Sequence, residues 1–177
     1  MTDTPKPPPV VNMDAVLADP ATSDTNAPGG DFDARLGAVG RALGSRRLGA
    51  TVTVVAPGKR AWPRHYHFTN DEMFVVLTGT GTFHFGDATY PLAPGDVAYV
   101  EAGTGIPFKI VNTGTEPLRY LAISTLEQAD VFVYPDSGKT GVLAGSGPMR
   151  GDQAEDRPRY LAFTRNGQPC GYWDGEI

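Results

Sequence analysis

The sequence predicts an all-β protein, built as a sandwich, barrel or jelly roll from many short strands. From residue 48 onward, short runs rich in β-branched and aromatic residues follow one another, separated by turn signals such as PGK, TGTG and APGD. The 22 glycines and 16 prolines are spread along the chain, as a fold with many tight turns requires. No long amphipathic helices alternate with these runs, which argues against a doubly wound α/β fold.

Residues 1–47 are expected to form an irregular N-terminal arm. Residues 1–9 are proline-rich, which favours an extended or disordered chain, and residues 11–19 fit one short helix. Residues 21–31 have the composition of a loop, and residues 31–47 show some helical spacing that their glycines weaken. We expect this arm to be partly disordered, or to pack on the barrel or on a partner subunit.

Residues 48–134 are expected to form the barrel, because they hold most of the predicted strands. In chain order these runs are LGATVTVVAP, HYHF, EMFVVLT, GTFHFG, ATYPL, DVAYV, PFKIVN, LRYLAIST and VFVY. Their β-branched and aromatic side chains suit a pleated, half-buried surface.

Residues 135–177 are expected to form a C-terminal extension of the barrel. The stretch 134–159 has the composition of a loop, and YLAFT at 160–164 is predicted as one last strand. The aromatic residues Tyr172 and Trp173 near the end are expected to dock on the barrel or on a partner subunit.

Charge and cysteine content exclude several classes of function. The formal net charge is -5 and no run of lysine or arginine occurs, which argues against a nucleic-acid partner. The single cysteine, Cys170, cannot form an internal disulfide and suits a reducing compartment. No apolar run approaches the length of a membrane span, and the first residues lack the apolar core of a signal peptide. We therefore expect a cytoplasmic protein without a membrane partner.

The chemistry-bearing part of the chain is the stretch PGKRAWPRHYHFTNDEMFVVLTG, residues 57–79. It holds two of the three histidines, His65 and His67, which point to the same face if they lie on one strand. Glu72 opens the next predicted strand and would come back beside them if the two strands pair as a hairpin. Two imidazoles and one carboxylate on one wall suit Fe(II), Mn(II), Zn(II) or Ni(II), with positions left open for water or substrate.

The same stretch resembles the first sequence motif of the cupin family. The resemblance rests on Gly58, the pair His65 and His67, then Glu72, and finally Gly79. In cupins this motif is a glycine, a spacer, His-x-His, a few residues, a glutamate and a further glycine. The resemblance implies that the two histidines and Glu72 are metal ligands.

A second cupin-like motif follows at residues 90–112, YPLAPGDVAYVEAGTGIPFKIVN. It supplies a Pro-Gly-Asp turn at 94–96, an Ala-Gly turn at 102–103 and a closing asparagine, Asn112. The resemblance covers residues 50–125 approximately. It implies a small barrel of the jelly-roll, or double-stranded β-helix, type that is often a homodimer and holds metal and substrate inside. The segments YLAIST, YPDSGK and YWDGE look like those of small bacterial cupins that are mostly uncharacterised.

One ligand expected from the resemblance is missing. The second cupin motif normally supplies a histidine four residues before the asparagine, and this chain has Phe108 there. Three outcomes stay open: a three-ligand site; a gap filled by another residue, of which His84 is the remaining histidine; or a degenerate site without metal. Strand alternation favours an outward His84, because Phe83 and Phe85 look like the core-facing pair.

Two classes of function follow. The first is an enzyme in which the metal acts as a Lewis acid or binds oxygen and an organic ligand, with dioxygenase-like or isomerase-like chemistry. The second is a non-catalytic module that binds a sugar or metabolite, which Phe108 and a degenerate metal site would favour. In either case a small-molecule ligand is expected inside the barrel, in a pocket lined by Phe74, Phe83, Phe108 and Asn112.

Overall fold

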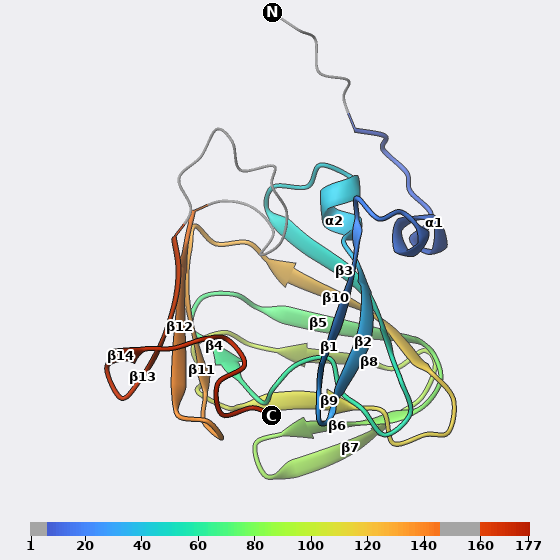
Figure 1. The fold of residues 1–177 in the computed structure, drawn as a ribbon. Helices are drawn as coiled ribbons and strands as arrows, with labels where there is room; N and C mark the ends of the chain where they lie inside the picture. Colours follow the sequence, from blue (N-terminus) through green and yellow to red (C-terminus); the bar gives the residue numbers. More distant parts are fainter. Residues whose placement is uncertain (1–6, 146–159) are drawn as a thin grey trace, which may run out of the picture.

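A computed structural model describes residues 7–145 and 160–177 of the chain and confirms the predicted all-β fold. Three sheets form the walls of a barrel, and two short helices pack outside it (Figure 1). The helices and strands are α1 (Met13–Ala18), β1 (Ser23–Gly29), β2 (Phe32–Gly37), α2 (Val39–Ala42), β3 (Leu48–Val55), β4 (Tyr66–His67), β5 (Glu72–Thr78), β6 (Gly81–Phe85), β7 (Ala88–Leu92), β8 (Val97–Val100), β9 (Phe108–Val111), β10 (Leu118–Thr125), β11 (Ala129–Tyr134), β12 (Lys139–Ala144), β13 (Tyr160–Arg165) and β14 (Gln168–Pro169).

The strands form three hydrogen-bonded groups in the described residues. The largest has the order β1-β2-β3-β10-β5-β8, the second is β14-β13-β12-β11-β4, and the third is β7-β6-β9. Neighbours such as β3 and β10 are far apart in the chain and pair antiparallel. This interleaving of distant strands is the arrangement of a jelly roll, as predicted.

The N-terminal arm is more regular than its composition suggested. The helix expected within residues 11–19 is confirmed as α1, and Asn12 caps it by accepting hydrogen bonds from two backbone N–H groups. Residues 21–31, expected to be a loop, instead contain β1, which forms a hairpin with β2 and extends the large sheet. Gly29 and Gly30 make the turn with φ values of 116° and 58°, which other residues rarely adopt. Within residues 31–47, only 39–42 are helical.

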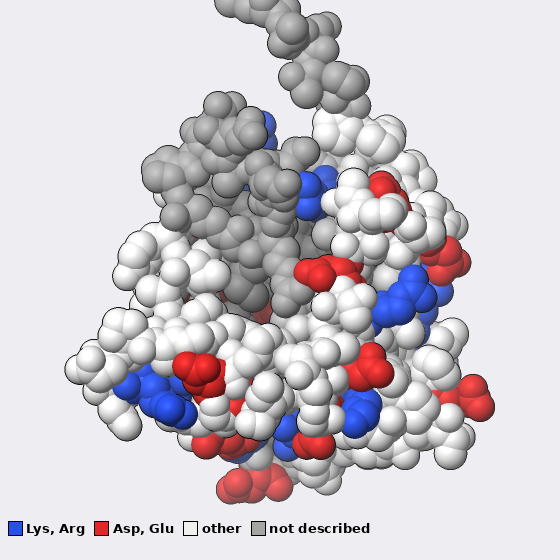
Figure 2. All heavy atoms as spheres, in the orientation of Figure 1, with Lys and Arg blue, Asp and Glu red and all other residues white. Residues whose placement is uncertain are grey.

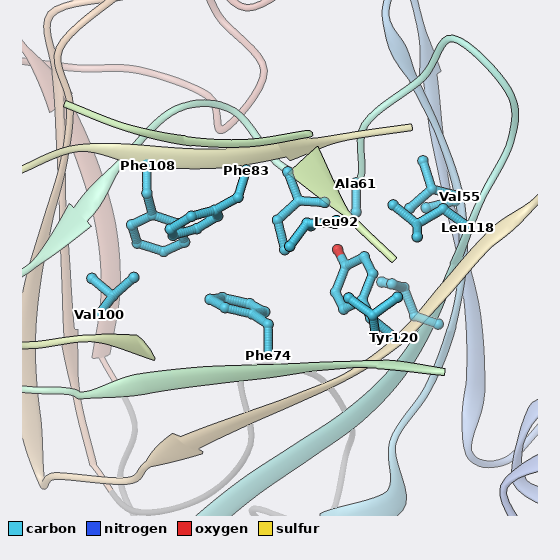
Figure 3. Packing of buried hydrophobic residues seen from close by; sticks show 13 residues of the cluster. Val55, Ala61, Phe74, Phe83, Leu92, Val100, Phe108, Leu118 and Tyr120 are labelled. Carbon is cyan, nitrogen blue, oxygen red and sulfur yellow. The ribbon is translucent and has the colours of Figure 1, made fainter. Parts of the chain in front are cut away.

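The core lies between the sheets and follows strand alternation. On β5, Phe74 and Val76 are buried while their neighbours are more exposed. The rings of Phe74, Phe83 and Phe108 approach one another inside the barrel (Figure 3). Each fully buried ring or aliphatic side chain contributes about 1.5–3 kcal/mol by leaving water. Phe74 and Phe108 also line the pocket that holds the candidate site.

A second apolar cluster fixes the two helices on the outer face of the large sheet. Val16 and Leu17 of α1 and Val39 of α2 pack with Val52 of β3. The helix α2 approaches β3 closely because Gly40 lacks a side chain, and a Cβ there would lie 2.9 Å from the Ala50 nitrogen. Neither helix of the described residues is long and apolar enough to cross a membrane.

The C-terminal extension adds strands to the second sheet and closes over the barrel. The strand expected at 160–164 is confirmed as β13, whereas the loop expected over 134–159 contains β12 at its start. Residues 146–159 lie outside the described residues. Trp173 packs on Phe32 with ring centroids 5.0 Å apart, and Tyr172 packs on Tyr134 at 5.8 Å. Both aromatic residues therefore dock on the barrel of the same chain.

Candidate metal centre

His65, His67 and Glu72 come together at one end of the barrel interior. The Glu72 Oε2 atom lies 4.0 Å from His65 Nε2 and 3.9 Å from His67 Nε2. One donor atom from each of the three residues lies within 4.8 Å of the other two, so the group could hold a metal ion. All three side chains are mostly buried.

The candidate ligands do not come together through the expected hairpin. His67 lies on β4, which pairs with β11 in the second sheet, whereas Glu72 begins β5 in the large sheet. His65 is held just before β4 by two backbone hydrogen bonds exchanged with Phe108 of β9. The short connection 68–71 crosses from one sheet to the other. The candidate centre therefore bridges the two sheets.

Hydrogen bonds leave both imidazoles ready to bind a cation. His65 Nδ1 lies 2.7 Å from the Pro63 carbonyl oxygen, which only accepts, so Nδ1 carries the proton. His67 Nδ1 lies 2.5 Å from Asp130 Oδ2 and donates to that carboxylate. In the neutral tautomers that these partners select, each Nε2 presents a lone pair toward Glu72. Partners of this kind orient histidine ligands in metalloproteins.

Asp130, at the start of β11, supports this arrangement and was not among the predicted site residues. It is 2% exposed and accepts hydrogen bonds from the Thr69 backbone and hydroxyl groups and from Asn70 Nδ2, at 2.8–3.1 Å. Its partner His67 is 63 residues away in the chain, so no local motif marks it. Asp130 thus fixes His67 and the connection between the two sheets at once.

The electrostatics of the group favour a bound cation. Burial, and then the nearby His67, lower the pKa of His65 to about 3, so His65 is neutral. Burial raises the pKa of Glu72, with the Asp130 charge adding to that rise and His67 opposing it. Burial opposes the charging of His67, but the Glu72 and Asp130 carboxylates outweigh it and raise its pKa. Two buried carboxylates therefore surround a site whose positive charge would come from a metal or from a protonated His67.

Metal affinity is expected to rise with pH as Glu72 and then His67 lose their protons, and the rise should continue above 6.5, the ordinary pKa of His67. His67 and Glu72 have raised pKa values, so each keeps a proton to higher pH than in a free peptide, and the metal must displace it. The rise in metal affinity should end once the pH exceeds the raised pKa of His67. Calorimetric titration with Zn(II) in buffers of different ionisation enthalpy measures the released protons. An affinity that does not change with pH would contradict the assignment of these ligands.

The position of the missing fourth ligand is apolar. Phe108 is 2% exposed, and its ring centroid lies 4.7 Å from that of His65, so it borders this candidate ligand directly. His84 does not take its place, because it faces the charges of Lys109, Arg64 and Arg60 away from the group. Among the described residues, the group therefore has three ligands and an apolar neighbour.

Replacing Phe108 with histidine is expected to raise divalent-metal affinity by about tenfold or more, which corresponds to about 1.4 kcal/mol. The new imidazole would stand beside His65, where the phenyl ring now lies, and could add a fourth ligand. The measurement is a competition titration against a coloured zinc chelator. Phe108→Leu, which keeps the position apolar, serves as the control and should bind metal as the natural chain does. Equal affinities for the two variants would show that Phe108 does not border the bound ion.

The three candidate ligands lie in a cavity of about 170 Å³. Its wall around the group is mostly aromatic and includes Trp62, Phe74, Phe108, Tyr120, Tyr134 and Tyr172. Two residues expected in the lining lie elsewhere. Phe83 belongs to the core, and the buried Asn112 side chain binds the backbone of Val55, Gly114 and Glu116.

Comparison with known proteins identifies the barrel. Residues 51–124 match the family model of the cupin domain. An uncharacterized protein of Methanocaldococcus jannaschii is 33% identical over 60 residues, which cover 34% of this chain and 46% of that protein. An oxalate-binding protein of Thermotoga maritima is 34% identical over 62 residues, which cover 35% of this chain and 50% of that protein. The chain thus spans about half the length of these curated relatives. Over residues 51–124, the barrel is therefore similar to the cupin domain.

Solved structures extend the likeness beyond the barrel. A sugar phosphate isomerase of the cupin superfamily from Silicibacter pomeroyi has a TM-score of 0.70 at 22% identity, covering 88% of this chain and 95% of that one. A putative sugar phosphate isomerase from Acidithiobacillus ferrooxidans has a TM-score of 0.67 at 24% identity, covering 86% and 90%. A predicted oxalate decarboxylase from Thermotoga maritima has a TM-score of 0.54 at 24% identity, covering 67% and 99%. At these identities the likeness establishes the fold, and function must be argued from the site.

Proposed function

We propose that this protein binds one divalent metal ion through His65, His67 and Glu72 and isomerises a small hydroxy-carbonyl compound of the sugar phosphate class. The observation that carries the proposal is the convergence of two imidazole Nε2 atoms and one carboxylate within 4.8 Å in an enclosed aromatic pocket. Two histidines and one carboxylate are a ligand set used by Fe, Mn, Zn and Ni sites.

A three-ligand centre leaves room for the substrate. Metal sites with three protein ligands keep open positions, which a compound with neighbouring hydroxyl and carbonyl oxygens can fill. When bound, the metal would supply Lewis-acid chemistry that stabilises negative charge on a carbonyl oxygen. The set also suits Fe(II) dioxygenase chemistry. The likeness to a sugar phosphate isomerase and to a putative sugar phosphate isomerase, over 88% and 86% of the chain, favours isomerisation.

The chain's own residues would position the substrate and handle its protons. Isomerisation moves one proton from the hydroxyl-bearing carbon to the neighbouring carbonyl carbon and a second proton from the hydroxyl oxygen to the carbonyl oxygen. A group near these carbons must hold the first proton in transit. The pocket offers the Glu72 carboxylate oxygen that would not bind the metal, and the hydroxyls of Tyr134 and Tyr172 beside the candidate centre. Burial raises the pKa of Tyr134 well above its ordinary value, so its hydroxyl stays protonated and can donate a hydrogen bond. Trp62 and Phe74 would exclude water from the reacting carbon.

The test is metal-dependent proton exchange in heavy water. Protein loaded with Mn(II), Fe(II), Zn(II) or Ni(II) is incubated with aldose and ketose phosphates, and NMR records interconversion and deuterium at the carbon beside the carbonyl. The proposal predicts exchange that needs the metal and is lost in His67→Ala. Protein that binds metal yet exchanges no deuterium with any substrate would refute the isomerase.

A second candidate is a binding protein without turnover. Phe108 favours it, because an apolar residue at the usual fourth-ligand position would weaken the centre. The partial relative from Thermotoga maritima is named as an oxalate-binding protein. For this chain, that function predicts that oxalate raises the unfolding temperature of the metal-loaded protein without being consumed.

A further inference from the structure

The pocket extends from the candidate metal centre to α2. Ser124 of β10 pairs with Glu72 on one side and with Gly49 of β3 on the other. Strands lie about 4.8 Å apart, so the Gly49 backbone is about 10 Å from that of Glu72. The helix α2 packs on this part of β3 through Gly40, and Arg41 follows it in the pocket lining. Arg41 therefore stands at the far end of the cavity from the candidate ligands.

The two ends of the pocket differ in polarity and in charge. At the base, the acidic group is Glu72, surrounded by aromatic rings. At the α2 end, the lining includes Arg41 and the hydroxyl-bearing residues Ser45 and Ser124. Lys109 also lines the pocket, but the charged neighbours of its ammonium group are Arg60, Asp136 and Arg64, which places that group outside the barrel. Among the described residues, Arg41 is thus the cation in the pocket lining at the α2 end.

Two further arginines follow Arg41 in the connection to β3. Arg46 and Arg47 are exposed, and basic side chains lie beside α2 on the face shown in Figure 2. Within 7–145 and 160–177, no ion pair occupies any of these three arginines. A local positive field on a chain of net charge -5 attracts small anions to this opening.

We propose that Arg41 binds the anionic group of the ligand, a phosphate in the sugar phosphate class, while the metal centre holds the hydroxy-carbonyl end. This inference rests on the proposed function for the class of ligand. The guanidinium group matches phosphate geometry with paired N–H donors. Ser124 and Ser45 supply hydroxyls near the same end, and Arg46 and Arg47 steer anions toward it. The separation of about 10 Å between the Gly49 and Glu72 backbones, which both line the pocket, suits a phosphorylated sugar.

The experiment compares matched ligand pairs by calorimetry on Mn(II)-loaded protein. The pairs are fructose with fructose 6-phosphate, and glucose with glucose 6-phosphate. The natural chain is expected to bind a phosphorylated sugar at least tenfold more tightly than its neutral partner, and Arg41→Ala should reduce that preference to about twofold or less. Arg41→Ala should keep the metal content and the affinity for the neutral sugar. Lys59→Ala, which removes one positive charge outside the pocket lining, should keep the preference.

Two results would overturn the assignment. The first is that the natural chain does not bind the phosphorylated sugars, or binds them no more tightly than the neutral sugars. The other is a preference that survives in Arg41→Ala. Failure of the proposed function would give a different result. The preference for phosphorylated sugars would persist and depend on Arg41, while the protein would bind no metal or would exchange no deuterium into the substrate.

Discussion

Replacing His67 with alanine is expected to lower divalent-metal affinity by about 100-fold or more while the barrel stays folded. The change removes one of three donor atoms, and two remaining ligands cannot hold the ion in the same way. Asp130 would keep its hydrogen bonds from Thr69 and Asn70, so the connection between the sheets should persist. Calorimetric titration with Zn(II) and with Mn(II) measures the loss.

Two further variants test whether the loss of metal affinity is specific to the candidate ligands. His84→Ala removes a histidine outside the group and should leave the affinity unchanged. Asp130→Asn keeps all three ligands but weakens the partner of His67 Nδ1, and a loss of about 10–100-fold is expected. If His84→Ala and His67→Ala lost metal to the same extent, binding would not occur at the proposed centre.

Replacing Lys139 with methionine is expected to cost about 3–5 kcal/mol of stability, because it leaves a buried carboxylate without its counter-ion. Lys139 is fully buried, and its Nζ atom lies 2.8 Å from Glu176 Oε1 and contacts the Tyr172 carbonyl oxygen. Ser137 donates a second hydrogen bond to the same carboxylate oxygen at 2.6 Å. Urea unfolding, followed by circular dichroism, measures the free-energy difference.

The double variant Lys139→Met/Glu176→Gln separates the ion pair from ordinary packing. Removing both charges should recover much of the loss, since the large cost comes from one unpaired buried charge. If the free energy of unfolding of Lys139→Met lies within about 1 kcal/mol of that of the natural chain, the ion pair does not hold the C-terminal segment. Because that segment carries Tyr172 into the pocket wall, the variant also tests how the extension shapes the site.

The three candidate ligands were predictable from the sequence because they lie close together in one motif. His65 and His67 share a face by strand alternation alone, and both the expected hairpin and the family resemblance added Glu72. The hairpin expected to join them was wrong, because β4 pairs with β11, which is far along the chain. Local spacing identifies side chains that can meet. It does not identify the strand that each segment pairs with.

Residues contributed by distant segments could not be predicted. Asp130 meets His67 across 63 residues, and Lys139 is an ordinary turn residue until Glu176 folds back on it. Strand β1 was missed because its outward residues are polar and its turn glycines suggest a loop. The expected homodimer, its cytoplasmic location and the division at residues 47 and 134 stay predictions.

The most direct test of the central claim is anomalous X-ray diffraction from crystals grown with Mn(II) or Zn(II). The account predicts one strong anomalous peak per chain within about 2.0–2.2 Å of His65 Nε2, His67 Nε2 and a Glu72 carboxylate oxygen. A metal-soaked crystal with no peak among these three residues, or with its peak elsewhere on the chain, would contradict the metal centre.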